Sequence, residues 1–189
     1  LVEASWITEF LVTIEENPDV GLKASSGWHR AGSSMVLRAL DTVPGEEAGR
    51  RLKFDSWETL GPDVLDSEGL VDAVTTLTVD APYTLRANYV SQYYVSVKIP
   101  GNTLVSEWMN HDAELNVKAP PVSVIVPSQR RMVFLQWEGD VELPTPEIIG
   151  LVKGPLDITA AYERQVLVTA MGPQEEAGSG WREVGTIAT

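Results

Sequence analysis

Three copies of one sequence pattern decide the fold of this chain: VEASWITEFLV at residues 2–12, LRANYVSQYYV at 85–95 and ITAAYERQVLV at 158–168. In each copy an Ala lies two positions before a large aromatic residue, and an apolar pair ending in Val follows. The aromatic residues are Trp6, Tyr89 and Tyr162, so the pattern recurs after 83 residues (89 − 6) and then after 73 (162 − 89). Repeats of this length are typical of arrays of small domains.

Further aromatic residues recur at the same spacing in different copies. Trp57 follows Trp28 by the same 29 residues that separate Trp137 from Trp108 (57 − 28 and 137 − 108). A phenylalanine precedes the second tryptophan of each pair by three positions, and a later Gly-Trp begins another copy. The sequence therefore predicts repeated structural positions at Trp28, Phe54, Trp57, Tyr89, Trp108, Phe134, Trp137, Tyr162 and Trp181.

The repeat frame divides the chain into modules. Residues 9–91 and 92–164 are predicted to be two complete β modules, residues 1–8 the closing strand of a preceding module, and residues 165–189 the opening strands of a third. We expect the chain to be a fragment of a longer polypeptide. The alternative is a permuted subunit whose terminal strands complete neighbouring subunits by strand exchange.

The local pattern is that of β-strands. Apolar residues alternate or cluster over short stretches bounded by Pro and Gly, at 92–99, 113–119, 131–137, 148–152 and 156–162. Five short strands in one repeat predict an all-β protein of small antiparallel modules, sandwich- or β-grasp-like. No Gly/Ser linker separates the repeats, which favours a rod.

One spacing conflicts with a regular strand. Phe54 and Phe134 lie three residues before Trp57 and Trp137, and residues three apart in a strand face opposite sides. The strand is therefore bulged near the tryptophan, or one ring covers a seam between modules.

Composition excludes several classes of function. The formal charge of −13 and the pI near 4.5 leave no basic stripe for nucleic acid. No apolar run is long enough to cross a bilayer, so no transmembrane segment is predicted in this chain. The absence of cysteine removes disulfides and thiolate chemistry. An acidic surface instead suits solubility or the uptake of divalent cations.

Candidate chemistry is sparse, and we expect no catalytic residue and no cofactor. Asp63, Asp66, Glu68 and Asp140 lie in acidic stretches and are the weak candidates for a metal, with calcium the cation that carboxylate oxygens favour. A plain charged surface is the competing interpretation. The two histidines, His29 and His111, do not occupy equivalent positions in the repeat.

The order of motifs resembles a group of known proteins. Gly27-Trp28 with Gly32, then the stretch FLQWEGD at 134–140, then Gly154-Pro155 followed by Ala160 and Tyr162 are similar to the tandem β repeats of prokaryotic cell-surface proteins. Those repeats are related to the divergent internalin B-repeat group, and the closing motif looks most like examples from hyperthermophilic archaea. Departures occur at Trp57, which lacks a compact Gly-Asp turn, and at Glu107, which stands where the pattern has Gly.

The resemblance implies an extracellular location at the cell surface and carries no catalytic residue with it. We therefore expect a non-catalytic structural or interaction segment of a surface-layer, filament or adhesin-like protein, whose partners are copies of itself or adjoining modules. The alternatives are a carbohydrate- or host-binding module, in which exposed tryptophans stack on sugars, and a spacer domain of a larger surface enzyme.

Overall fold

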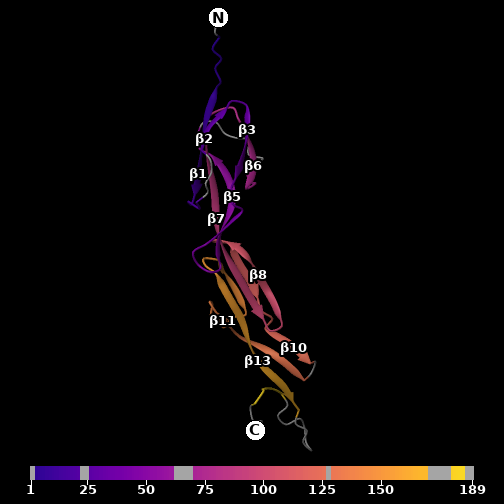
Figure 1. Cartoon of the computed structure of the whole chain (residues 1–189). Helices are drawn as coiled ribbons and strands as arrows, with labels where there is room; N and C mark the ends of the chain where they lie inside the picture. Colours follow the sequence, from indigo (N-terminus) through magenta and orange to yellow (C-terminus); the bar gives the residue numbers. More distant parts are fainter. Residues whose placement is uncertain (1–2, 22–25, 62–69, 127–128, 170–179, 186–189) are drawn as a thin grey trace, which may run out of the picture. The chain divides into compact units, whose positions relative to one another are not determined.

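The computed structural model describes residues 3–21, 26–61, 70–126, 129–169 and 180–185 (Figure 1). The chain divides into two compact units, Leu1–Gln92 and Tyr93–Thr189. All regular elements of the described residues are β-strands, which confirms the prediction of an all-β protein. Among these residues, no helix has the length and apolarity needed to span a bilayer.

Unit 1 is built from one larger sheet and a two-stranded sheet. Its strands are β1 (Glu9–Asn17), β2 (Gly27–Arg30), β3 (Ser33–Arg38), β4 (Thr42–Pro44), β5 (Arg50–Thr59), β6 (Val74–Val79) and the first part of β7 (Tyr83–Ile99). β1 pairs with β2 antiparallel and with β7 parallel, and β5 pairs with both β4 and β7. β3 and β6, which lie side by side in Figure 1, form the antiparallel two-stranded sheet.

Unit 2 begins within β7, because this strand continues to Ile99. Its further strands are β8 (Asn102–Asn110), β9 (Glu114–Lys118), β10 (Val122–Val126), β11 (Arg130–Gly139), β12 (Glu147–Leu151), β13 (Leu156–Val168) and β14 (Gly180–Glu183). β7 pairs with β8 and, in parallel, with β13. β11 pairs antiparallel with β10 and β13, while β9 and β12 form a separate antiparallel pair.

The pairings of the two units correspond strand by strand. When each strand number of unit 1 is raised by six, every pairing becomes one of unit 2: β1–β2 becomes β7–β8, and β1–β7 becomes β7–β13. Hydrogen bonds of corresponding turns also match between the two units. The Gly32 amide donates to the Val79 carbonyl (2.8 Å), and the Asp112 amide donates to the Val152 carbonyl (2.8 Å). Gly32 and Asp112 also share a positive φ, +76° and +61°.

The continuation of β13 resembles the start of unit 1. β13 pairs with β14 antiparallel, with Leu167 opposite Trp181, just as Leu11 lies opposite Trp28 in β1 and β2. Near these pairs, the Ala31 amide donates to the carbonyl of Thr8, two residues before Phe10. A matching bond joins the Val184 amide to the carbonyl of Arg164 (3.0 Å).

The expectation of purely antiparallel modules is wrong in one respect. In both units the first and last strands pair in parallel, over Val12–Asn17 with Tyr83–Asn88 and over Val95–Lys98 with Leu156–Thr159. Parallel neighbours need a long crossover connection. Here the intervening strands of the unit supply that connection, so the sheets are mixed.

Each unit has its own apolar core. The buried core of unit 1 contains Val12, Leu37, Ala39, Phe54, Trp57, Leu77, Val79, Tyr83, Leu85, Ala87 and Tyr89. That of unit 2 contains Tyr93, Val95, Val97, Leu115, Val117, Ala119, Trp137, Ile148, Val152, Ile158 and Ala160. The early part of β7 shows how the sequence selects these residues, since every second side chain from Tyr83 to Tyr89 is buried.

Candidate functional site

The repeated aromatic residues form one cluster in each unit. In unit 1, the Phe54 ring lies 5.7 Å from that of Trp57 and 5.7 Å from that of Tyr89, edge-on to the latter at 83°. All three side chains are buried. Such tilted contacts are the geometry that aromatic rings prefer, and each large ring removes much apolar area from water.

Unit 2 contains the same cluster with nearly the same geometry. The Phe134 ring lies 5.7 Å from those of both Trp137 and Tyr162, at 63° and 88°. Trp137 is fully buried, whereas Phe134 and Tyr162 are half-buried. Trp137 belongs to the buried core and the other two rings pack against it, so the cluster has the character of a core rather than of a ligand site.

A β-bulge accounts for the spacing of three residues between Phe134 and Trp137. Phe134 lies opposite Tyr162, but Gln136 lies opposite Ala161, so Leu135 is left over in β11. The extra residue returns Trp137 to the face that Phe134 occupies. Of the two alternatives that the sequence left open, the bulge is therefore confirmed in unit 2.

The tyrosine hydroxyl of each cluster bonds to the backbone of an adjacent loop. The Leu40 amide donates to the Tyr89 hydroxyl at 3.2 Å, and the Tyr162 hydroxyl donates to the Pro120 carbonyl at 2.8 Å. Pro120 has no amide hydrogen to donate to the tyrosine, as Leu40 does, so the Tyr162 hydroxyl instead donates to the Pro120 carbonyl. Burial raises the pKa of both tyrosines above the ordinary value, which keeps the hydroxyls protonated.

Replacing these tyrosines by phenylalanine tests the contribution of the hydroxyls. Tyr162→Phe is expected to lower the free energy of unfolding by about 0.5–1.5 kcal/mol, because it removes one hydrogen bond and no ring. Tyr89→Phe is expected to cost at least as much, since it leaves the part-buried Leu40 amide without its acceptor. Urea denaturation followed by circular dichroism measures both, and unchanged midpoints would show that the hydroxyls contribute nothing.

The first tryptophan of each copy lies on an edge strand: Trp28 on β2, Trp108 on β8 and Trp181 on β14. Trp28 on β2 is 67% exposed and stands opposite Leu11. Trp108 on β8 makes an edge contact with Tyr94 at 5.5 Å. Trp181 on β14 is covered by Arg131, whose guanidinium carbon lies 4.3 Å from the ring centroid. A guanidinium above an indole is a favourable cation–π contact.

Arg131 belongs to a repeated contact that the sequence analysis did not identify. Its Nε donates to Gln165 Oε1 at 2.8 Å, and in unit 1 the Nε of Arg51 donates to Gln92 Oε1 at 2.9 Å. The signal was present, because the arginine lies six residues before the buried tryptophan in both copies and the glutamine lies three residues after the tyrosine. Among the described residues, no ion pair joins Arg130 or Arg131 to Glu138 or Asp140.

Of the metal candidates, Asp63, Asp66 and Glu68 lie outside the described residues. Asp140 is described, and its carboxylate accepts a hydrogen bond from the Asp157 amide at 2.7 Å. Within the described ranges, no group of three or more His, Asp or Glu side chains is placed to hold a metal. Asp140 therefore ties the end of β11 to the beginning of β13.

Asp157 belongs to β13 and lies opposite Ser96 of β7. Its carboxylate accepts a hydrogen bond from Lys98 Nζ at 2.8 Å. That bond, followed by one from Ser96, holds the pKa of Asp157 below the ordinary value. Because the pKa of Asp157 is lower in the folded protein than in the unfolded chain, the pair stabilises the fold fully at pH values above the unfolded pKa of Asp157. This stabilisation is lost as the pH falls through the folded pKa of Asp157.

Removing the lysine tests this pair. In Lys98→Met the pKa of Asp157 is expected to rise toward its ordinary value, leaving only the smaller lowering due to Ser96, as measured by NMR titration of the side-chain carboxyl carbon. Lys118→Met is the matched control, because Lys118 lies 4.0 Å from Glu147 and contacts another strand. An unchanged Asp157 titration would contradict the assignment.

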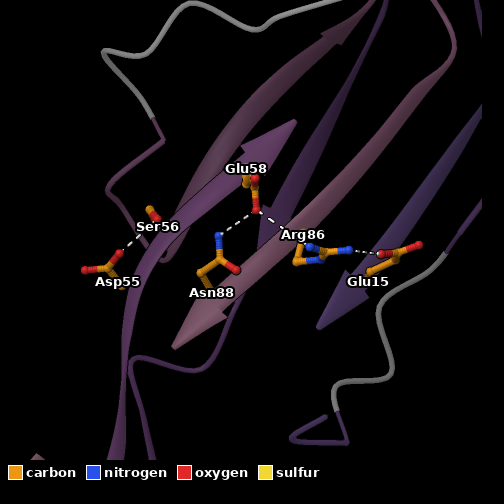
Figure 2. Close-up of polar contacts among 6 residues, drawn as sticks. All are labelled: Glu15, Asp55, Ser56, Glu58, Arg86 and Asn88. Carbon is orange, nitrogen blue, oxygen red and sulfur yellow. Dashed lines mark hydrogen bonds and ion pairs between the residues drawn. The ribbon is translucent and has the colours of Figure 1, made fainter. Parts of the chain in front are cut away.

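A polar network crosses the outer face of three strands in unit 1 (Figure 2). Arg86 of β7 lies between Glu15 of β1 at 3.0 Å and Glu58 of β5 at 3.9 Å, and Asn88 donates to Glu58 at 3.2 Å. Because all these groups are partly exposed, each ion pair contributes only about 0.2–1 kcal/mol. The network aligns the strands and leaves no free cation for a ligand.

Comparisons with protein-family models, curated proteins and solved structures find no match to this chain.

Proposed function

We propose that the chain is a non-catalytic structural and interaction segment of an extracellular surface-layer, filament or adhesin-like protein, and that its two units are copies of one β module. The observation that carries the proposal is the correspondence of strand pairings together with the use of β7 by both units. A chain that reuses its last strand as the next first strand is suited to extension by repetition.

The surface properties are consistent with this role. The charge of −13 keeps a protein soluble at high local concentration, and exposed apolar side chains such as Ile149 and Leu151 on β12 offer contact area to a neighbour. The predicted boundaries 9–91 and 92–164, and an arrangement of the modules as a rod, are part of the same proposal. Small-angle X-ray scattering of the full chain tests the rod.

Self-association is the experimental test of the function. The purified chain is followed by sedimentation velocity and electron microscopy at increasing concentration, with and without calcium. We expect the chain to form regular polymers. The double substitution Ile149→Lys with Leu151→Lys is expected to weaken their formation. Val36→Lys is the control for the effect of added charge alone. It places a lysine at an exposed apolar position of β3 in unit 1.

A carbohydrate- or host-binding module is the second candidate, and the exposure of Trp28 favours it. An indole that is 67% exposed next to Leu11 has the flat apolar surface on which sugars stack. Saturable glycan binding that Trp28→Ala abolishes, in a protein that stays monomeric, would replace the structural proposal by this one. Trp57→Phe is the control, because Trp57 is buried.

A further inference from the structure

Unit 2 contains a hollow of about 430 Å³ where β11, β13 and β14 lie side by side. Its wall is formed by three arginines, one glutamine and three apolar residues: Arg130, Arg131, Arg164, Gln165, Ile125, Val166 and Val184. Pockets that take small ligands have volumes of roughly 300–1,000 Å³ and combine an apolar floor with a few polar groups. The hollow falls within that range.

The register of the three strands explains why arginines gather there. Arg130 lies opposite Val166, and Val166 lies opposite Arg182, so these three side chains project from the same face of the sheet. Arg164 is two residues from Val166 and therefore shares that face. Three cationic side chains thus surround one valine in a protein of net charge −13.

The acidic neighbours lie on the opposite face. Gln165 lies opposite both Arg131 and Glu183, so the carboxylates of Glu163 and Glu183 project from the other face of the sheet from Arg164 and Val166. Gln165 Nε2 donates to Glu163 Oε1 at 2.8 Å on that side. Among the residues that the structure describes, no carboxylate lies within ion-pair distance of Arg130 or Arg164.

The preceding copy of the motif shows what creates the space. In the sequence repeat, Tyr93 corresponds to Val166, and His111 corresponds to Val184, since His111 and Val184 each follow their tryptophan by three residues. The rings of Tyr93 and His111 contact each other at 5.8 Å. The valines in both places are smaller than the two rings. Ser91 and Met109 stand where this copy has Arg164 and Arg182.

We propose that this hollow binds a small organic anion, with the carboxylate or sulfate group held by Arg130 and Arg164 and the body of the ligand against Val166 and Val184. Guanidinium groups match planar oxyanions through paired N–H donors. Three positions differ from the preceding copy here: Arg164 replaces a serine, and Val166 and Val184 replace two rings, so charge and volume change together.

The test measures binding of glucuronate to the full chain by isothermal titration calorimetry, with the arginine Nε–Hε NMR signals locating the site. Inorganic sulfate and neutral glucose are the comparison ligands. We expect saturable binding of glucuronate, weaker binding of sulfate and none of glucose. Equal binding of glucose and glucuronate would overturn the proposal, because the arginines would then contribute nothing.

Two variants locate the binding. Arg164→Ser restores the residue of the preceding copy and is expected to weaken glucuronate binding about ten- to hundredfold, as for the loss of one charge-assisted hydrogen-bonding group. Val166→Tyr with Val184→His refills the hollow and is expected to abolish binding. The control is Arg38→Ser, which removes an exposed arginine of β3 in unit 1.

Circular dichroism melting checks that each variant is folded. Retained binding in the refilled variant, or an equal loss in Arg164→Ser and Arg38→Ser, would show non-specific attraction to basic side chains and overturn the site. If Val166→Tyr with Val184→His does not fold, Val166→Leu, which narrows the hollow without a ring, gives the same test of volume.

Discussion

Trp137→Ala is expected to lower the free energy of unfolding of unit 2 by about 3–5 kcal/mol, the usual cost of removing a large buried ring. Trp137 has no exposed surface and packs against Phe134 at 5.7 Å. Among the described residues its indole Nε1–H has no hydrogen-bond partner, so the stabilisation comes from apolar packing. Trp57→Ala is expected to have the same effect on unit 1, where Trp57 is 2% exposed. Chemical denaturation monitored by circular dichroism measures both.

Exposed tryptophans of the same chain provide the control. Trp28→Ala and Trp6→Ala remove rings that are 67% and 93% exposed, and both should change stability by no more than about 0.5 kcal/mol. A loss at Trp28 as large as that at Trp137 would mean that Trp28 is covered by a partner under the conditions of the experiment.

Gly139→Ala is the second substitution with a large expected effect. Gly139 is the last residue of the bulged strand β11 and has a φ of +109°, and an added Cβ would fall 2.2 Å from the Asp157 carbonyl oxygen. The alanine would need both a backbone conformation that costs about 1–3 kcal/mol and a displacement of β13. We expect a combined loss above about 3 kcal/mol, or a protein that does not fold, measured by thermal and urea denaturation.

Gly101→Ala separates the two contributions. Gly101 also has a positive φ, +78°, but nothing lies within 4 Å of its added Cβ. Its replacement should cost only about 1–2 kcal/mol of backbone strain. Equal losses at the two glycines would show that the close approach of Asp157 has no energetic consequence.

The all-β class and most strands were predictable because their signal is local. The stretches at 113–119, 131–137, 148–152 and 156–162 each coincide with an observed strand, since one buried face forces apolar residues to alternate. β8 was missed for the same reason. Its side chains are exposed or half-buried throughout, so NTLVSEWMN carries no alternation. β10 was missed because it is a short strand between the prolines at 120–121 and 127.

Parallel pairing was not predictable in this way. Alternation tells which face of a strand is buried but not which distant strand lies beside it. Val12 and Tyr83 are neighbours in the sheet although they are far apart in the sequence. Only a long-range argument would have placed the first and last strands of a unit together.

The repeated aromatic residues were recognisable in the sequence because they keep their spacing, and the structure brings Phe54, Trp57 and Tyr89 into contact. The arginine-lined hollow was not recognisable. Arg130 and Arg164 meet only through the register of β11 on β13, and a shift of one residue would send them to opposite faces.

The parallel pairing also determines how each unit responds to tension. Pulling the chain from its two ends draws the first and last strands of a unit in opposite directions along their common ladder. The hydrogen bonds are then loaded together in shear instead of being opened one after another as in a zipper. The ladder between β1 and β7 contains six residue pairs and that between β7 and β13 contains four, so the first unit should resist the greater load.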